Sequence, residues 1–523
     1  MPLSPDPDRV RTAEVVAALC LATDLGMGLP FEQGLRSAVV AMRVAERLGV
    51  DEATARQTYF GCLLFYAGCT ADADVQAALF PEGALVEHWT PVMFGSSREA
   101  TVGVLTALAA GEGVRPKRVL RAFGRLPAAA IGYRQHVAAL CEVTELIAAG
   151  LALPADVTGM FWDLTERWDG DGPLSRARGT DLPLALRIIH VARDAVFQAQ
   201  LRNPAYSAEL LRRRAGKAFD HDVVAAVLAD PNEILELPAE ISVWDATLDS
   251  EPGPRRVLEG AQIDDALLSA GAFADLVSPN FTGHSRAVGE VAGSAAAMAG
   301  CSAAASRAVR RAGYLHDLGR IGVPFAVWQQ PGKVDADGWE KIRLHAYHTE
   351  RLLSRSPFLA TLGSIAGCHH ERLDGSGYHR GLPAAGLAVP ARVLAAADAY
   401  CTKTEPRPHR AALGPSEAAS QLRSEADAGR LDADSVAAVL RAAGHQPGDV
   451  RRPRGLTARE GQALTLLARG RATKQIAQAL GVTPKTADHY VQRVYDKIGV
   501  SSRAAAAVYA MQHGFATWEN THS

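Results

Sequence analysis

The sequence predicts an all-α protein made of two similar helical units followed by a small helix-turn-helix domain. Apolar residues make up 48% of the chain and aromatic residues only 6%, and the period-two alternation of strands is scarce. Segments such as 38–49 and 434–444 place apolar residues three and four apart and end on glycine, as capped amphipathic helices do. At 523 residues the chain is too long for one core, so about three or four domains are expected.

An internal repeat with a spacing of about 205 residues indicates the two similar units. Residues 166–195 and 371–399 share the order Glu-Arg, Asp-Gly, a second glycine, a proline-containing loop, an apolar run and Asp-Ala. Residues 215–228 and 428–440 resemble each other further along. We therefore predict one copy at 10–240 and another at 256–445, with a joint at 245–256, where proline, glycine and charge cannot support a helix interior.

The composition also excludes several classes of protein. No window of about 18 residues is apolar enough to cross a bilayer, and the first residues lack the pattern of a secretion signal. Seven cysteines without CxxC spacing argue against a disulfide framework or a zinc ribbon. We expect a cytoplasmic protein with no membrane partner.

Clustered histidines form the strongest chemical signal. Eight of the sixteen histidines lie between residues 284 and 409. Imidazole and carboxylate ligands together suit iron, manganese or zinc, and more than four of them imply more than one ion. A carboxylate such as Asp317 can bridge two ions, an arrangement suited to phosphate ester hydrolysis. The candidates are His284, His316, Asp317, His345, His348, His369, His370 and Asp398, with His348 equally suited to support a neighbouring ligand.

These residues carry a family resemblance. Their order, together with "HDLGRIGVP", "PGKVDADGWEKIRLH" and "HHERLDGSGY", resembles the HD-GYP subgroup of HD-superfamily metal phosphohydrolases over about residues 280–410. The resemblance implies a helical domain that uses two divalent ions, iron or manganese, to hydrolyse cyclic di-GMP or a related nucleotide phosphodiester. The metal ligands that it implies are His284, His316, Asp317, His345, His369, His370 and Asp398.

Four positions depart from the pattern of that family. His379 replaces a proline, Arg320 a lysine, Asn280 a glutamate found in trinuclear members, and Cys401 an acidic residue. Asn280 therefore favours two ions over three, and Arg320 can neutralise phosphate charge but cannot donate a proton. The expected catalytic residues are Asp317, Arg320 and Arg372. The expected substrate-binding residues, on a loop whose glycines allow close approach of the backbone, are Gly375, Gly377, Tyr378 and His379.

The first copy lacks this ligand set. It retains only Asp194 and cannot assemble the same centre. We predict that it serves as a scaffold or as a regulatory unit for an unknown ligand. The residues at the other corresponding positions are Gln33, Phe65, Tyr66, Leu140, Leu164 and Thr165.

Residues 451–515 form a basic segment that contains eleven Lys and Arg residues but three acidic residues. Thr457 and Glu460 have the spacing of a capping box, a second helix ends at Gly481, and Thr483 precedes Pro484 at the start of a third. With "LTxRE", "IAxxLGV" and "KIGV", the segment resembles the LuxR-type DNA-binding domain. A basic three-helix bundle that binds protein is the alternative.

This second resemblance implies binding to double-stranded DNA by a homodimer, through a helix in the major groove. The expected DNA-binding residues are Lys474, Lys485, Thr486, His489, Gln492, Arg493 and Lys497.

Two functional hypotheses remain. In the first, the protein is a metal-dependent phosphodiesterase for a cyclic dinucleotide or another nucleotide phosphate, joined to a DNA-binding domain. In the second, it is a non-catalytic transcription regulator whose HD units sense a ligand and support dimerisation. The full ligand set favours the first, whereas Arg320 and His379 favour the second.

Overall fold

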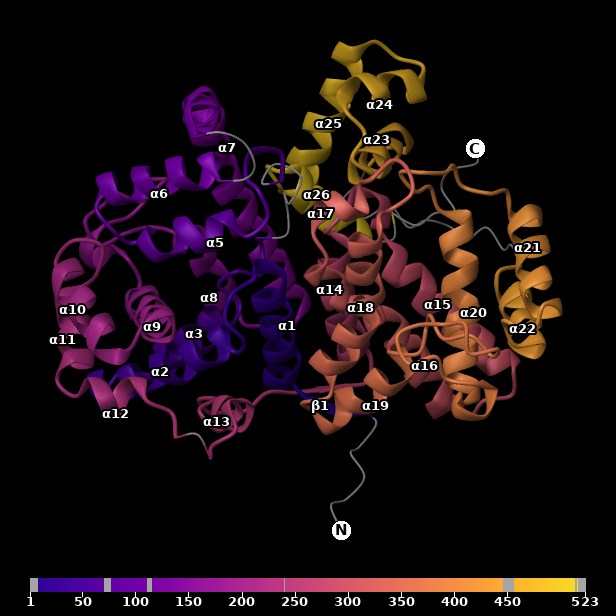
Figure 1. Ribbon diagram of the computed structural model, residues 1–523, viewed down its shortest axis with the longest axis horizontal. Helices are drawn as coiled ribbons and strands as arrows, with labels where there is room; N and C mark the ends of the chain where they lie inside the picture. Colours follow the sequence, from indigo (N-terminus) through magenta and orange to yellow (C-terminus); the bar gives the residue numbers. More distant parts are fainter. Residues whose placement is uncertain are drawn as a thin grey trace. The chain divides into compact units, whose positions relative to one another are not determined.

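The computed structural model describes residues 8–69, 77–110, 115–238, 240–444, 456–512 and 515. These residues are mainly helical, and their only strands, β1 (Arg9–Arg11) and β2 (Val257–Glu259), pair in a two-stranded sheet (Figure 1). The all-α prediction is therefore confirmed. The chain divides into two compact units, Arg11–Val257 and Leu258–Ser523, and the second also includes Met1–Val10. Within the described residues, no helix is both long and apolar enough to cross a membrane.

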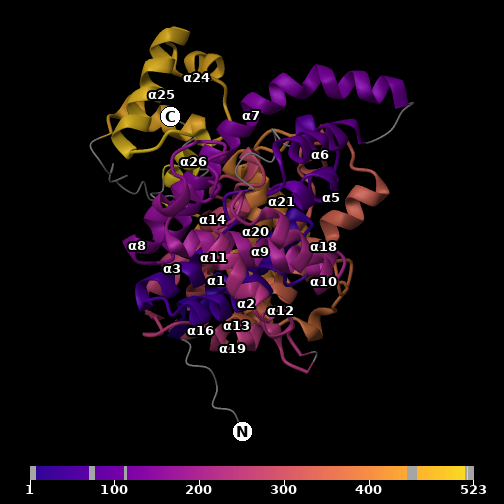
Figure 2. The same cartoon turned by 90° about the vertical axis from the view of Figure 1, so that its left-hand side faces the viewer.

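The unit Arg11–Val257 is built around α2 and α9, which pack against each other and against α3. α2 ends at Leu48, and Gly49 follows in a left-handed conformation (φ 63°), as the glycine at the end of segment 38–49 predicted. α7, the long helix in Figure 2, spans 36 residues. The helices are α1 (Thr12–Met27), α2 (Gln33–Leu48), α3 (Glu52–Leu63), α5 (Ala84–His88), η1 (Thr90–Val92), α6 (Ser97–Ala109), α7 (Arg115–Gly150), α8 (Ala155–Thr158), η2 (Gly159–Asp163), η3 (Gly179–Asp181), α9 (Leu184–Leu201), α10 (Pro204–Arg214), α11 (His221–Leu228), α12 (Pro231–Leu235) and α13 (Val243–Asp249).

The joint predicted at 245–256 is helical in its first part. α13 continues to Asp249, because the Ser242 hydroxyl accepts a hydrogen bond from the Asp245 amide at the start of this helix and the first proline comes only at Pro252. Proline, glycine and charge in residues 445–455 predict a second joint, which lies outside the described residues.

The unit that begins at Leu258 places its helices around α15, which contacts α16, α20 and α22. Its helices up to residue 444 are α14 (Ala261–Asp275), η4 (Pro279–Phe281), α15 (His284–Met298), α16 (Ala303–Leu315), η5 (Leu318–Gly322), α17 (Phe325–Trp328), α18 (Ala336–Leu353), α19 (Pro357–Ala366), η6 (Ala384–Gly386), α20 (Val389–Thr404), α21 (Pro415–Asp427) and α22 (Ala433–Ala442).

Glycines bring four of these elements into close contact, in two pairs. A Cβ atom on Gly313 of α16 would lie 2.6 Å from the Cα atom of Gly289 in α15, so only glycine fits at this crossing. A Cβ atom on Gly319 of η5 would lie 2.2 Å from the carbonyl oxygen of His345 in α18. The close approach of these backbones brings α15 next to α16, and it brings η5, which follows α16, next to the middle of α18.

The two units share a detail that supports the internal repeat. In the first, the buried Asp24 carboxylate accepts a hydrogen bond from the Gly34 amide at the start of α2 (2.8 Å). In the second, the buried Asp275 carboxylate accepts one from the Ser285 amide at the start of α15 (3.1 Å). Each carboxylate lies ten residues before the amide that it anchors, so both units fix the corresponding helix in the same way.

The C-terminal helices are α23 (Ala458–Ala468), α24 (Thr473–Leu480), α25 (Pro484–Ile498) and α26 (Arg503–Gln512). The capping box of Thr457 and Glu460 is present, α24 ends at Gly481 in a left-handed conformation, and Thr483 caps α25. These three predictions are confirmed. The Glu460 carboxylate also pairs with the Lys497 ammonium (2.7 Å), which ties α23 to α25.

We predict that Glu460→Ala destabilises this helical domain by roughly 1–2 kcal/mol, because it removes a cap and an ion pair. Burial alone would raise the pKa of Glu460, but Lys497 and Thr457 outweigh it and lower the pKa from 4.5 to about 2. A carboxyl with a lowered pKa stabilises the fold fully above about pH 4.5 and loses this effect as the pH falls toward 2. Hydrogen exchange of α23 should therefore separate wild type from variant at pH 7 and much less at pH 3. An equal difference at both pH values would contradict a role for the charge.

Candidate metal centre

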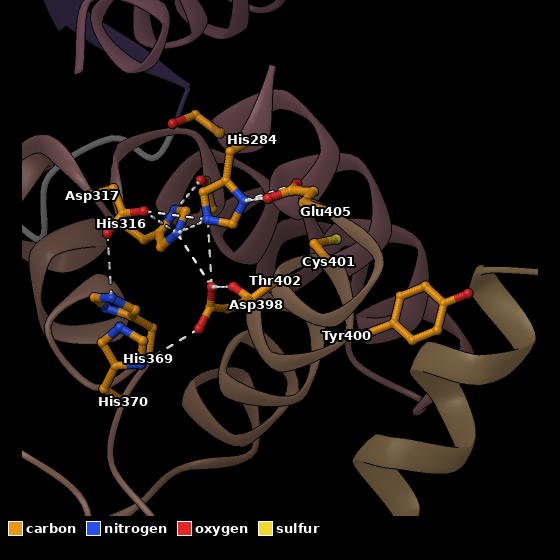
Figure 3. A network of polar contacts seen from close by, with 12 residues as sticks. His284, His316, Asp317, His369, His370, Asp398, Tyr400, Cys401, Thr402 and Glu405 are labelled. Carbon is orange, nitrogen blue, oxygen red and sulfur yellow. Dashed lines mark hydrogen bonds and ion pairs between the residues drawn. The ribbon is translucent and has the colours of Figure 1, made fainter. Parts of the chain in front are cut away.

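The seven ligand candidates reach one buried region from four helices and the loops beside them. His284 begins α15, His316 ends α16, and Asp317 follows before η5. His345 and Asp398 lie inside α18 and α20. His369 and His370 follow α19, and only His370 is partly exposed. Figure 3 shows ligand side chains that point toward one another, namely those of His284, His316, Asp317, His369, His370 and Asp398.

The first group of ligand atoms surrounds one carboxylate oxygen of Asp317. Its Oδ2 atom lies 3.3 Å from Nε2 of His284 and 3.0 Å from Nε2 of His316. Asp398 Oδ1 lies 3.4 Å from the same atom of His284. His284, His316 and Asp398 are close enough together to hold a metal ion.

The second group surrounds the other oxygen of the same carboxylate. Asp317 Oδ1 lies 3.2 Å from Nε2 of His345 and 3.5 Å from Nε2 of His369. His345, His369 and His370 also form a group that could hold a metal ion. Asp317 therefore lies between two sets of ligands, with one oxygen directed at each, as a bridging carboxylate would be.

The hydrogen bonds of the imidazoles show that this region fits cations. The Nδ1 atoms of His316, His345 and His369 each contact a backbone carbonyl oxygen three residues earlier, so Nδ1 carries the proton and Nε2 is left as an acceptor. The Nε2 atoms of His345 and His369 nevertheless lie 3.0 Å apart. Facing lone pairs beside ionised carboxylates are unfavourable unless a cation lies between them, and the donor set suits iron or manganese.

Three of the pKa shifts agree with this chemistry, and one differs, because the nearby carboxylates, foremost Glu405, outweigh burial and hold the pKa of His284 well above 6.5. Burial lowers the pKa of His345 and, with the charge of His369, holds that of His370 well below 6.5, which favours neutral rings. Burial would raise the pKa of Asp317, but Arg320 and His316 outweigh it and hold the pKa well below 3.8. The carboxylate is therefore ionised at neutral pH, as a bridging ligand requires.

Sequence reasoning missed one member of this site. The Glu405 carboxylate lies 2.9 Å from Nδ1 of His284 and is itself paired with Arg407 at 2.8 Å. It lies seven residues after Asp398, at the position directly after the last residue of α20, Thr404. A carboxylate on Nδ1 orients Nε2 toward the other ligands and makes it more basic. A Glu seven residues after a predicted ligand was the available signal.

We predict that Glu405→Gln lowers the affinity for Mn(II) about tenfold, because the amide still accepts from His284 but carries no charge. Titration of the metal-free protein against a chelating indicator measures this. Glu417→Gln, at an exposed position of α21, is the matched control. Equal affinities for the two variants, with an unchanged circular dichroism spectrum, would exclude this role of Glu405.

The two candidate catalytic arginines occupy different places. Arg320 is buried, forms an ion pair with Asp317 and stacks on Phe281, with its guanidinium carbon 3.9 Å from the ring centroid. Arg372 lines a cavity of about 320 Å³ that opens beside His370 and Asp398. The same cavity is lined by Lys403 and Arg410. Arg320 therefore lies inside the ligand cluster, whereas Arg372 belongs to a basic cavity next to it.

The predicted substrate loop lies against the ligand cluster through Tyr378. The ring centroid of Tyr378 is 4.7 Å from that of His370. A Cβ atom on Gly377 would lie 2.5 Å from the Arg372 amide nitrogen, so the loop can close here only with glycine. Gly375 has φ 76°, which also favours glycine. His379 contacts Glu350 (3.8 Å) and Tyr347.

Three further residues that the sequence analysis singled out, His348, Asn280 and Cys401, lie in surroundings different from those of the ligand candidates. His348 is not part of any of the three ligand groups found among the described residues. The Asn280 amide group donates to Ser278 and Gln329, at 3.2 and 3.4 Å. Cys401 is fully buried one turn after Asp398.

In the first unit, a guanidinium and aromatic rings occupy the region that corresponds to the candidate metal centre of the second unit. The Arg193 guanidinium lies 4.7 Å from the ring centroid of Phe65 and 4.4 Å from that of Tyr66, and the Arg193 carbonyl accepts from Gln33. The retained Asp194 pairs with the buried Arg214. Leu140 and Leu164 are buried, and Thr165 follows Leu164. No group of His, Cys, Asp and Glu in the described part of this unit could hold a metal.

Most of the predicted DNA-binding side chains lie on the surface of α24 and α25. Lys474, Lys485, His489, Gln492 and Arg493 are exposed. Thr486 is partly exposed, and its hydroxyl bonds to Thr483 at 2.8 Å. Lys497 differs, because its pairing with Glu460 binds it to α23. Lys497 stays in the predicted DNA-binding set, and its ion pair with Glu460 also contributes to the packing of the domain.

Comparison with known proteins adds the following. Residues 272–435 match the HD domain family, and residues 454–510 match the bacterial regulatory proteins of the luxR family. Over 439 residues the chain is 28% identical to a protein named 3'3'-cGAMP-specific phosphodiesterase 3 of Vibrio cholerae, covering 82% of this chain and 94% of that protein. Over 129 residues it is 35% identical to a cyclic di-GMP phosphodiesterase of Thermotoga maritima, covering 24% of this chain and 35% of that protein.

A solved structure shares the fold over most of the chain. The crystal structure of a cyclic GMP-AMP specific phosphodiesterase of V. cholerae matches with a TM-score of 0.57 and 23% identity, covering 84% of this chain and 99% of that one. The two family matches show that the chain carries an HD domain at residues 272–435 and a C-terminal helix-turn-helix domain of the luxR family at residues 454–510.

Proposed function

We propose that the HD domain is a dinuclear-metal phosphodiesterase that hydrolyses a cyclic dinucleotide, and that the C-terminal domain binds double-stranded DNA as part of a homodimer. One observation carries the enzymatic part: Asp317 directs its two oxygens at two separate groups of imidazole ligands. The names of the V. cholerae and T. maritima relatives support a cyclic dinucleotide as substrate.

The residues of the site divide into three roles. His284, His316 and Asp398 would hold one ion, His345, His369 and His370 the other, and Asp317 both. Two such ions, iron or manganese, would supply a hydroxide nucleophile at neutral pH and would neutralise phosphate oxygens. Asp317 would be the ligand common to both ions, and Arg320 holds the Asp317 carboxylate in place by its ion pair. Because a guanidinium stays protonated, Arg320 contributes charge and takes no part in proton transfer.

The basic cavity next to the ligands suits the phosphates of the substrate. Arg372, Lys403 and Arg410 line it together with His370 and Asp398. Cations in a partly desolvated cavity stabilise the charge that develops on a phosphodiester during attack. We assign Arg372 to this role, with Tyr378 and the glycines of its loop shaping the adjoining wall.

The exposed side of α25 supports the DNA-binding part of the proposal. Thr483 and Pro484 start this helix, and the exposed Lys485, His489 and Arg493 follow at four-residue steps on one face. Such a face can enter a major groove, with its first residues at base edges and its cations near phosphates.

Turnover by the purified full-length protein tests the enzymatic proposal. The metal-free protein is reconstituted with Fe(II) or Mn(II) and incubated with cyclic di-GMP or 3'3'-cGAMP, and chromatography follows the appearance of linear dinucleotides. We expect hydrolysis of at least one of them, inhibited by a chelator. Absence of hydrolysis with two bound equivalents of either metal would favour the non-catalytic sensor.

A further inference from the structure

An exposed aromatic stripe runs along α18 beside the candidate metal centre. Trp339, Arg343 and Tyr347 lie four residues apart and so share one face of this helix. Trp339 is 45% exposed and Tyr347 is 40% exposed, which is unusual for such large apolar side chains. The buried face of α18 is formed by other residues, among them Ile342 and Ala346. The stripe is therefore not needed for packing of the helix.

Tyr378 connects this stripe to the ligands. Its ring centroid lies 4.7 Å from that of His370 and 6.3 Å from that of His345. On its other side the centroid of Trp339 lies 5.9 Å away, with the two rings nearly perpendicular (73°). The Arg343 guanidinium carbon is 5.9 Å from the Tyr378 centroid. Trp339 therefore stands one aromatic ring away from a candidate metal ligand.

We propose that this stripe binds a nucleobase of the cyclic dinucleotide, with Trp339 as the stacking surface and Arg343 as a neighbouring cation. The inference rests on the proposed function, because the phosphodiester must lie at the metal centre. A base attached to that phosphodiester through its ribose then has to lie at the rim of the site. Every base has an aromatic face, so an exposed tryptophan binds it whatever its identity, and a nearby guanidinium adds a cation–π contribution.

This surface is distinct from the residues that would hold the phosphates. Arg372, Lys403 and Arg410 line the basic cavity and supply charge, whereas the stripe supplies flat apolar area. The division predicts that Trp339 affects substrate binding far more than the chemical step. A change at Trp339 should therefore alter KM and leave kcat nearly constant.

The test compares the full-length wild type with Trp339→Ala, Trp339→Phe and Leu344→Ala. Leu344 is the matched control, since it is 42% exposed on the same helix and lies about 140° around the axis from Trp339. Two readouts are used. Steady-state hydrolysis of cyclic di-GMP or 3'3'-cGAMP, whichever the wild type hydrolyses faster, gives KM and kcat. A cyclic dinucleotide with one 2-aminopurine base and two phosphorothioate linkages, which resist hydrolysis, reports stacking by quenching of its fluorescence.

We expect Trp339→Ala to raise KM about 5- to 100-fold with kcat within about twofold of wild type, and to abolish the quenching. Trp339→Phe should retain most of the substrate affinity and most of the quenching. Leu344→Ala should have the KM, the kcat and the quenching of wild type. Wild-type hydrolysis with an unchanged KM and equal quenching in Trp339→Ala would overturn this inference and leave the proposed function standing. Quenching that depends on Trp339 in a protein without hydrolysis would overturn the enzymatic function and support the base site. A wild type that neither hydrolyses nor binds would overturn both.

Discussion

Asp317→Asn is expected to abolish tight binding of both metal ions and to lower turnover of the cyclic dinucleotide at least ~10³-fold. Each oxygen of Asp317 serves one ligand group, so the amide replaces one acceptor by a donor and removes the charge shared by both ions. Loss of the charge stabilisation that two metal ions provide costs several kcal/mol in the transition state. Inductively coupled plasma mass spectrometry of the purified protein measures bound metal, and chromatography of the linear product measures turnover.

Asp194→Asn in the first unit is the matched control for this experiment. Asp194 is buried at the position that corresponds to Asp398, but it pairs with Arg214 and belongs to none of the ligand groups found in the described part of the chain. We expect the same metal content and turnover as wild type, with some loss of thermal stability because Arg214 is left buried without its carboxylate. Metal loss in both variants would mean that the first unit contributes to the centre. Metal retained by Asp317→Asn would show that Asp317 is no bridging ligand.

The helical fold and the candidate metal ligands could be predicted from the sequence, but from different kinds of signal. Apolar spacing and terminal glycines are local signals. Helices such as α2 and α24 could therefore be predicted together with the residue at which each helix ends. The ligand candidates are chemically conspicuous, since histidines are few and eight of them crowd into one quarter of the chain. Their sorting into two groups around Asp317 depends on the close crossing of α15 and α16 at Gly289 and Gly313, which no local pattern reveals.

The features that sequence reasoning missed depend on partners distant in the chain. No local pattern distinguishes Glu405 from the other glutamates of the chain, because its partner His284 is brought to it only by the packing of α15 and α20. Lys497 has the spacing of a DNA-contacting cation, but a capping-box carboxylate 37 residues earlier pairs with it. Trp339 lies in a segment that already carried the family resemblance, and its exposure beside Tyr378 becomes visible only when α18 and the glycine loop are placed together.

The double variant Lys485→Ala with Arg493→Ala is expected to weaken binding to double-stranded DNA about 10²-fold at low salt. Both side chains are exposed on the same face of α25, near the start and the middle of the helix. Each lost phosphate contact reduces the slope of log affinity against log salt by about 0.9, so the slope should fall by about two. Fluorescence anisotropy with a labelled duplex of arbitrary sequence at several salt concentrations measures affinity and slope.

The control for this DNA experiment must remove the same charge elsewhere. Lys333→Ala with Lys341→Ala changes net charge by the same amount outside the C-terminal domain, at one exposed and one partly exposed position. We expect its salt slope to equal that of wild type, because counterion release is counted at the residues that meet phosphates and not over the whole chain. If the two double variants lose affinity and slope equally, DNA is attracted by overall charge and α25 is not the binding face. A loss confined to the α25 variant assigns binding to that helix.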